Sequence, residues 1–167
     1  MTDIHVDVDR DEERRTLSLT TRFDADPARV WQVWADPRQL ERWWGPPTYP
    51  ATVVDHDLRP GGAVSYYMTG PEGDRYHGWW SVRSVDAPHH LEFEDGFADD
   101  TGRPDPDRPV TTVHVSIEAD GDGTRMRVTS TFGSLEAMRE LDAMGMVDGM
   151  TAAMGQIPEV LATSAVA

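Results

Sequence analysis

The sequence predicts an α+β fold in which an antiparallel sheet of six to seven strands curves around one long C-terminal helix. Three observations support this prediction. Two short helix signals follow the first strand, a series of strand-like segments joined by turns fills the middle, and a helical stripe of apolar and small residues closes the chain. An antiparallel sheet must cover its apolar face, and only the last helix is long enough to cover it.

Length and composition indicate one globular domain. The chain has 167 residues, of which 38% are hydrophobic and 27% are charged. We expect a flexible acidic lead-in over residues 1–15, a single domain over residues 16–162 and a frayed end at residues 163–167. The N-terminus lacks the basic start and apolar stretch of a signal peptide, and no apolar segment is long enough to cross a membrane. We therefore expect a cytoplasmic protein.

Charge and cysteine content exclude several classes of function. The chain has no cysteine, which excludes disulfides, iron–sulfur clusters and cysteine-ligated zinc. Its formal net charge of −15 would repel nucleic acid and anionic membrane surfaces, so we expect neither as a partner. The six histidines show none of the spacings that place two metal ligands on one helix face. We expect no metal and no other cofactor.

Local signals predict the first strand and the two short helices. Residues 16–23 alternate with the period of a half-buried strand. Asp26 and Asp36 are each followed by a proline. Each aspartate is expected to cap a helix, and the proline after it occupies the first helical position, where its missing N–H costs nothing. The second helix is expected to carry Trp43 and Trp44 before a glycine and two prolines end it.

The rest of the chain predicts a meander followed by a helix. Six strand-like segments are separated by turns rich in glycine, proline and aspartate: 51–58, 63–70, 75–85, 91–97, 110–119 and 124–132. Ser134 is expected to cap a long terminal helix, in which Gly145 and Gly149 make the centre of the apolar stripe small. Pro158 is expected to end or bend this helix near Gly155.

Several stretches, in this order, resemble the START/Bet v 1-like superfamily, and more narrowly the bacterial proteins related to the C-terminal domain of the activator of Hsp90 ATPase. The resemblance covers about residues 16–161 and is carried by VWQVWADPRQLERWWGP, DHDLRPGGAVSYYMTGPEGDRYHG, VDAPHHLEF, GTRMRVTSTF and MGMVDGMTAAMGQIPEVLA. It implies a helix-grip fold with a cavity between the sheet and the long helix. The superfamily includes lipid and hormone binders, aromatic cyclases and co-chaperones, so the fold does not select one activity.

Aromatic and methionine side chains are the candidates to line this cavity, because the small residues of the helix leave volume to be filled or left empty. The candidate ligand-binding residues are Trp43, Trp44, Tyr66, Met68, Trp80, Phe93, Met126, Met146, Met150 and Met154. Ordinary core packing is the alternative for each of them. On a helix Trp43 and Trp44 lie about 100° apart, so we expect one to fill the core and the other to flank it at the edge of the cavity.

Asp95 and His77 are the candidate catalytic residues. If Leu91 and Phe93 face the core, strand alternation turns Asp95 inward, where burial would raise its pKa toward that of a general base. The alternative is that the strand has ended and that Asp95 begins an acidic loop. His77 adjoins a glycine on a strand and is placed either to line the cavity or to serve a structural role.

Two functions remain open from the sequence. One is the binding of a small hydrophobic or aromatic molecule, neutral or cationic in view of the acidic field, with cyclase-like or hydrolase-like activity as an extension. The other is a co-chaperone-like interaction module related to activators of Hsp90 ATPase, which rests on the resemblance. A homodimer is compatible with both.

Overall fold

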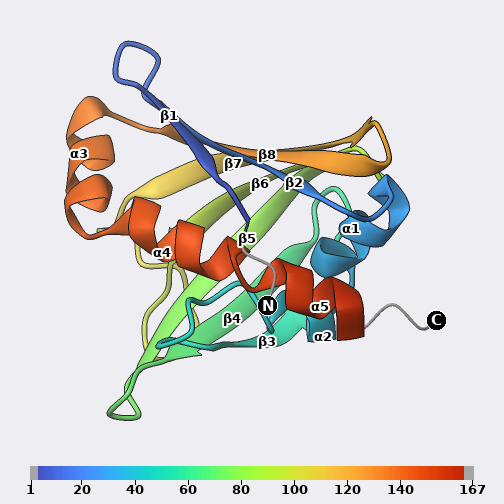
Figure 1. The fold of residues 1–167 in the computed structure, drawn as a ribbon. Helices are drawn as coiled ribbons and strands as arrows, with labels where there is room; N and C mark the ends of the chain where they lie inside the picture. Colours follow the sequence, from blue (N-terminus) through green and yellow to red (C-terminus); the bar gives the residue numbers. More distant parts are fainter. Residues whose placement is uncertain (1–3, 164–167) are drawn as a thin grey trace.

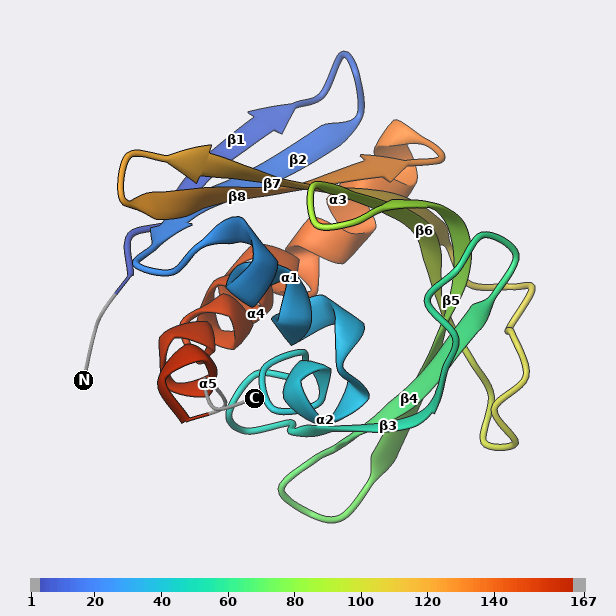
Figure 2. The same ribbon diagram turned by 90° about the vertical axis from the view of Figure 1, so that its right-hand side faces the viewer.

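The structure is a computed structural model that describes residues 4–163. Eight strands form one antiparallel sheet in the order β1-β2-β8-β7-β6-β5-β4-β3. The strands are β1 (Asp7–Asp11), β2 (Thr16–Phe23), β3 (Ala51–His56), β4 (Ala63–Thr69), β5 (Arg75–Asp86), β6 (His90–Phe97), β7 (Val110–Asp120) and β8 (Gly123–Phe132). The sheet curves around the helices, which lie on its concave side (Figures 1 and 2). The predicted α+β class is confirmed.

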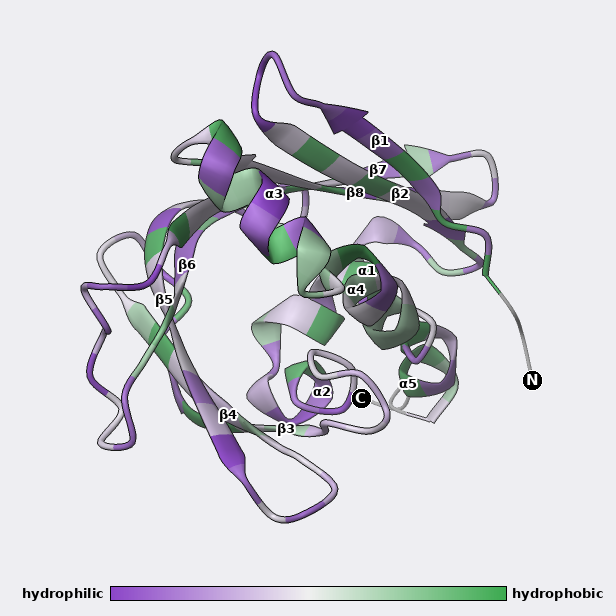
Figure 3. Ribbon diagram, turned by 90° about the vertical axis from the view of Figure 1, so that its left-hand side faces the viewer, coloured by the Kyte–Doolittle hydropathy of each residue, from purple (hydrophilic) through white to green (hydrophobic). Residues whose placement is uncertain are grey.

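The sheet has one strand more than the six to seven predicted, because part of the expected lead-in pairs with the sheet. Residues 7–11 form β1, which runs antiparallel to β2. The strand is largely exposed and hydrophilic (Figure 3), and the apolar alternation of Ile4, Val6 and Val8 ends near its start, so most of the strand shows no apolar pattern. Residues 1–3 of the lead-in and residues 164–167 of the expected frayed end lie outside the described residues.

The two short helices start where the sequence predicts. They are α1 (Pro27–Ala35) and α2 (Pro37–Leu40), and the side chains of Asp26 and Asp36 accept hydrogen bonds from backbone N–H groups of their first turns. The second helix is shorter than expected, since it ends at Leu40 and leaves both tryptophans in the following turn. A Cβ at Gly45 would lie 2.0 Å from the carbonyl oxygen of Tyr49, so the chain reverses tightly there.

The terminal helix is broken into three segments, and the prediction of one long helix is wrong in this respect. They are α3 (Leu135–Ala143), α4 (Met146–Met154) and α5 (Ile157–Thr163). The first break is at Gly145, whose φ of 89° is left-handed and incompatible with a continuous helix. The second is at residues 155–156, next to Pro158, where the bend was expected. Together the segments still run across the concave face of the sheet (Figure 1).

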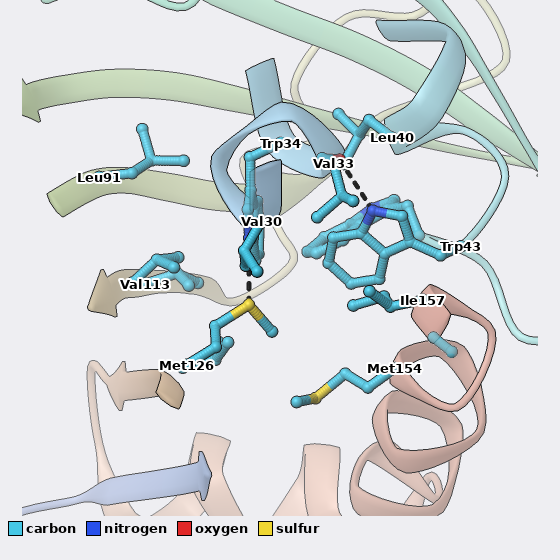
Figure 4. Close-up of a cluster of buried hydrophobic side chains, with 14 of the residues drawn as sticks. Val30, Val33, Trp34, Leu40, Trp43, Leu91, Val113, Met126, Met154 and Ile157 are labelled. Carbon is cyan, nitrogen blue, oxygen red and sulfur yellow. Dashed lines mark hydrogen bonds between the residues drawn. The ribbon is translucent and has the colours of Figure 1, made fainter. Parts of the chain in front are cut away.

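The main hydrophobic core lies between the sheet, the short helices and α4–α5. Its largest fully buried side chains include Trp34, Trp43, Met154 and Ile157 (Figure 4). A smaller cluster lies beneath α3. Between these two packed regions the interior is open, and the candidate site lies there.

Candidate functional site

A cavity of about 220 Å³ lies between the concave face of the sheet and the helices α3 and α4. Its walls come from strands β4 to β7, from the turn after α2 and from both sides of the break at Gly145. The lining residues are Trp44, Tyr66, Met68, Tyr76, His77, Gly78, Asp95, Gly96, Phe97, Pro109, Thr111, Leu141, Met146 and Met150. Most of these side chains are apolar, so the cavity presents an apolar surface with few polar groups.

The polar end of the cavity is formed by Tyr66 and Asp95. The Tyr66 hydroxyl donates a hydrogen bond of 2.9 Å to Asp95 Oδ1. Tyr66 is on β4 and Asp95 on β6, so the tyrosine ring must pass over β5 between them. It does so at Gly78, its cross-strand partner, where a Cβ would lie 2.4 Å from the ring and the hydroxyl. The missing side chain at position 78 is therefore a requirement of this hydrogen bond.

Asp95 lies inside β6 rather than at the start of a loop, and it faces the cavity as strand alternation predicts. Its cross-strand neighbours are Trp80 and Thr111. Burial raises the pKa of Asp95 to about 7, and this effect is only partly offset by the Tyr66 hydroxyl and the Trp80 indole. Burial and the nearby carboxylate raise the pKa of Tyr66 well above its usual value, so Tyr66 stays protonated as a donor.

Two indole N–H groups flank this pair. Nε1 of Trp44 and Nε1 of Trp80 are buried and make no hydrogen bond of good geometry within the described part of the chain. Both indoles nevertheless lie near enough to lower the pKa of Tyr66, and Trp80 also lowers that of Asp95. The polar end thus consists of one carboxyl group beside a tyrosine hydroxyl and two indole N–H groups, all of which can donate hydrogen bonds.

Five of the ten candidate ligand-binding residues line the cavity: Trp44, Tyr66, Met68, Met146 and Met150. The other five do not line it and belong to the packed core: Trp43, Trp80, Phe93, Met126 and Met154. Core packing, the alternative considered for every candidate, therefore describes these five. A side chain on the concave side of the sheet contacts either a helix or the open cavity. The alternation of apolar residues in the sequence is the same in both cases, so it does not tell them apart.

Contacts in the core hold four of these five side chains in place outside the cavity lining. Met126 accepts a hydrogen bond from Trp34 Nε1 at 3.3 Å, and Trp80 stacks on Phe93 with ring centroids 3.9 Å apart (the first contact is shown in Figure 4). The two tryptophans lie in the turn after α2 rather than on a helix, and they take different positions. Trp43 is fully buried and donates to the Val33 carbonyl at 2.8 Å, while Trp44 lines the cavity.

His77 borders the cavity, but its ring lies on the other face of the sheet. Cross-strand partners share a face, and His77 pairs with Tyr67, whose ring centroid is 5.6 Å away. The neighbouring pair, Tyr66 and Gly78, faces the cavity. The imidazole is therefore not placed to act on a molecule inside the cavity.

Several lining residues were not singled out from the sequence. Thr111 becomes part of the site because it pairs with Asp95, and Phe97 because it pairs with Gly78. Strand alternation marks both as inward-facing, but their distance from Asp95 depends on a register that the sequence does not fix. Leu141 of α3 also lines the cavity.

The mouth of the cavity is marked by exposed tyrosines. Tyr76 lines the cavity and is 55% exposed, so it lies where the cavity meets solvent. Its ring packs edge-on against Tyr49, with centroids 5.8 Å apart. Tyr49 comes from the tight turn after α2, so the mouth is bordered by that turn and by the start of β5.

Other kinds of site are not found in the described residues. Within residues 4–163, no three histidine, aspartate or glutamate side chains are grouped so that they could hold a metal ion. No helix in this range is long and apolar enough to cross a bilayer. A larger surface groove of about 670 Å³ lies between β2 and α5, but its lining is rich in charged side chains and borders both ends of the described chain.

Comparisons with known proteins agree with this architecture. Two solved structures are closely similar: a Mycobacterium smegmatis protein with 47% identity, covering 95% of this chain and 96% of that one with a TM-score of 0.87, and an Arthrobacter aurescens protein with 50% identity, 93% and 91% coverage and a TM-score of 0.90. An AHSA1 protein from Silicibacter pomeroyi is 24% identical over 89% of this chain and 99% of that one, with a TM-score of 0.70, and shows the fold alone. No curated protein matches the chain.

The match to a family model extends over most of the domain. The model described as activator of Hsp90 ATPase homolog 1-like protein matches residues 24–162, which include both short helices, the strands that line the cavity and nearly all of the terminal helices. The helix-grip arrangement expected from the resemblance is confirmed by the sheet and by the solved structures. The chain therefore belongs to the activator of Hsp90 ATPase homolog 1-like family.

Proposed function

We propose that the protein binds a small, largely apolar molecule in the cavity between the sheet and α3–α4, with the polar group of that molecule at the Tyr66–Asp95 pair. The observation that carries this proposal is the cavity itself, in which methionine, aromatic and leucine side chains surround one hydrogen-bonded polar pair. Ligand sites in proteins have this composition, with apolar walls for affinity and few polar groups for orientation.

The cost of the cavity supports a function for it. Protein interiors are close-packed, and an unfilled space deprives its walls of dispersion contacts. A carboxyl group inside such a space costs more, because its charged form loses hydration that one tyrosine hydroxyl only partly replaces. An apolar side chain at position 95 and bulkier helix residues would remove both costs. The presence of the carboxyl and the space is explained if a ligand uses them.

Two methods detect a ligand of any chemical identity. Native mass spectrometry of the purified protein reveals a molecule that stays bound, and a thermal-shift screen of small aromatic and aliphatic molecules reveals binding because binding to the folded state raises its stability. Met150→Phe places a larger side chain in the cavity and should abolish the shifts. Met144→Phe is the matched control, because Met144 is 59% exposed and the same change there should leave the shifts intact. Equal shifts in both variants would contradict the proposal.

Catalysis is an extension of the same proposal. A carboxyl with a pKa of about 7 is suited to accept a proton near neutral pH, and Asp95 is the residue with this property in the cavity. For a cyclase-like or hydrolase-like reaction, Asp95→Asn should reduce kcat at saturating substrate by a factor of about 10² or more. An unchanged kcat in this variant would remove Asp95 as the general base.

Interaction with an Hsp90-type chaperone stays a prediction drawn from the family resemblance. It is checked by adding the purified protein to a bacterial Hsp90 and measuring ATP hydrolysis. Stimulation that persists in Met150→Phe would indicate a surface interaction separate from the cavity.

A further inference from the structure

The carboxyl group of the cavity has no positive partner. All 15 basic residues of the chain are arginine, and none of them lines the cavity. No ion pair within residues 4–163 includes Asp95. The basic side chain that comes to the cavity wall is Arg108, which is exposed and stacks on Phe97 with 4.2 Å between its guanidinium carbon and the ring centroid.

The groups around Asp95 suit its ionised form. Tyr66 donates to Oδ1, and the indole N–H groups of Trp44 and Trp80 lie beside the pair without a hydrogen bond of good geometry to any of residues 4–163. These three groups supply hydrogen-bond donors, which favour a carboxylate over a neutral carboxylic acid. The site therefore provides a carboxylate and the hydrogen-bond donors that stabilise it, and a cationic group of a ligand would complete the ion pair.

The walls and the field of the protein also favour a cation. Trp44, Tyr66, Tyr76 and Phe97 contribute aromatic rings to the lining, and such rings attract ammonium and guanidinium groups. Phe97 already holds the Arg108 guanidinium in this way. The net charge of −15 repels anions and raises the local concentration of cations. The hydrocarbon part of a ligand would lie against Met68, Met146 and Met150.

We propose that the occupant of the cavity is a lipophilic amine, bound as its ammonium ion against the Asp95 carboxylate, with its apolar part among the methionine and aromatic side chains. This inference rests on the proposed function, because it names the chemical class of the ligand for the same cavity. It makes a more specific claim, because binding of a neutral apolar ligand would agree with the proposed function but would contradict this inference.

The pH dependence of binding follows from the groups that face Asp95. From β4 this is Tyr66, whose pKa is raised, so it stays neutral. The other groups near Asp95 carry no titratable side chain: Trp80 on β5, Thr111 on β7, Trp44 in the turn, and the helix residues at the cavity. The His77 ring lies on the opposite face of the sheet. Asp95 is therefore the group that changes charge between pH 6 and 8. Because the ammonium ion binds the carboxylate, its affinity should rise about tenfold between these pH values.

The experiment compares three probes that share a 2-phenylethyl group by isothermal titration calorimetry: 2-phenylethylamine, 2-phenylethanol and 3-phenylpropanoate. At pH 8 the amine should bind at least about tenfold more tightly than the alcohol, and the carboxylate should bind most weakly. Lowering the pH to 6 should weaken amine binding about tenfold and leave the alcohol unchanged. Amine binding should release protons, which is measured from the dependence of the heat on the ionisation enthalpy of the buffer.

Two variants locate the effect. Asp95→Asn should bind the amine and the alcohol equally and lose the pH dependence, and its thermal unfolding shows whether it folds. Asp100→Asn is the control, since Asp100 is an exposed acid in the nearby loop and does not line the cavity, so the preference for the amine should persist.

Three results with the parent protein would overturn the inference: equal binding of amine and alcohol at pH 8, tighter binding of the carboxylate, or binding of none of the three probes. The first two would leave the proposed function intact, because a ligand would still occupy the cavity. The proposed function is judged separately by the thermal-shift screen and the Met150→Phe variant. Amine preference that survives in Asp95→Asn would also overturn the inference by placing the cation elsewhere.

Discussion

The interior beneath the curved sheet has two ends that are filled in opposite ways. At the end next to α1 and α5, Trp34, Trp43 and Met154 are fully buried, and both indole N–H groups find an acceptor. At the end next to the break between α3 and α4, Trp44 and Tyr66 face a cavity of about 220 Å³. There Asp95 is enclosed, and the indole N–H of Trp44 has no hydrogen bond of good geometry among the described residues.

The difference shows how one fold separates stability from binding. The packed end buries aromatic surface with satisfied polar groups and is expected to supply much of the folding free energy. The other end keeps an unfilled volume and a carboxyl whose pKa is raised to about 7, both of which lower stability. Four variants or pairs of variants test this division, from the largest expected effect to the smallest.

The first test uses two methionines one turn apart on α4. Met154→Ala removes a fully buried side chain of the packed end and should lower the free energy of unfolding by about 2–5 kcal/mol. Met150→Ala removes a half-buried side chain from the wall of a space that is already open, and should cost about 1 kcal/mol or less. Urea unfolding measures both values. Similar losses in the two variants would mean that the ends are equally packed.

The second test concerns the carboxyl. A folded-state pKa of about 7 exceeds the usual value of about 4, so the folded protein binds the proton more tightly, and stability is lost as the pH rises from about 4 to about 7. The loss is on the order of 2–4 kcal/mol. Asp95→Asn lacks this loss, so its free energy of unfolding should rise relative to that of the parent as the pH increases over this range. A constant difference between pH 4 and pH 8 in urea unfolding would contradict the assignment.

The third test acts on the Tyr66–Asp95 pair through the backbone of β5. In Gly78→Ala the new Cβ would lie 2.4 Å from the Tyr66 ring, so the ring must move and its hydrogen bond to Asp95 should break. Overpacking of this kind should cost about 1–3 kcal/mol. Loss of the tyrosine donor should also raise the pKa of Asp95 further, which carboxyl NMR titration measures. An unchanged pKa would show that the ring retains its position.

The fourth test is a glycine without such a neighbour. Gly149 lies inside α4, and a Cβ there would meet no atom within 4 Å. Gly149→Ala should therefore raise the free energy of unfolding by about 0.5–1 kcal/mol through helix propensity alone. Thermal unfolding measures the gain, and a loss of stability would indicate that the helix surface at this position is needed by another contact.

Much of the fold was predictable because local signals determine it. The two Asp–Pro helix starts, the strand over residues 16–23 and the bend near Gly155 all follow from capping, alternation and the missing N–H of proline. Strand β1 was missed because four of its five residues are polar and pair through their backbones, and the alternation of Ile4, Val6 and Val8 ends near its start. The break at Gly145 was missed because a glycine on an apolar stripe is compatible with both a helix and a left-handed stop.

The site was predictable only in part, for a related reason. Alternation indicated that Asp95 turns inward, and composition indicated an aromatic and methionine-rich interior. Neither property distinguishes Met150, which lines the cavity, from Met154, which is packed one turn later. The same holds for Trp44 and Trp43, whose positions differ by one residue.

The sequence by itself determined the class of fold, the order of most elements and the family resemblance, while it left Asp95 either inward-facing on a strand or in a loop. These depend on periodicity, capping and motifs, which act over a few residues. The tertiary structure alone decided which inward side chains meet a helix and which meet open space, and that Tyr66 passes over Gly78 to reach Asp95. Those features depend on strand register and on the break at Gly145, which set distances between residues far apart in the chain.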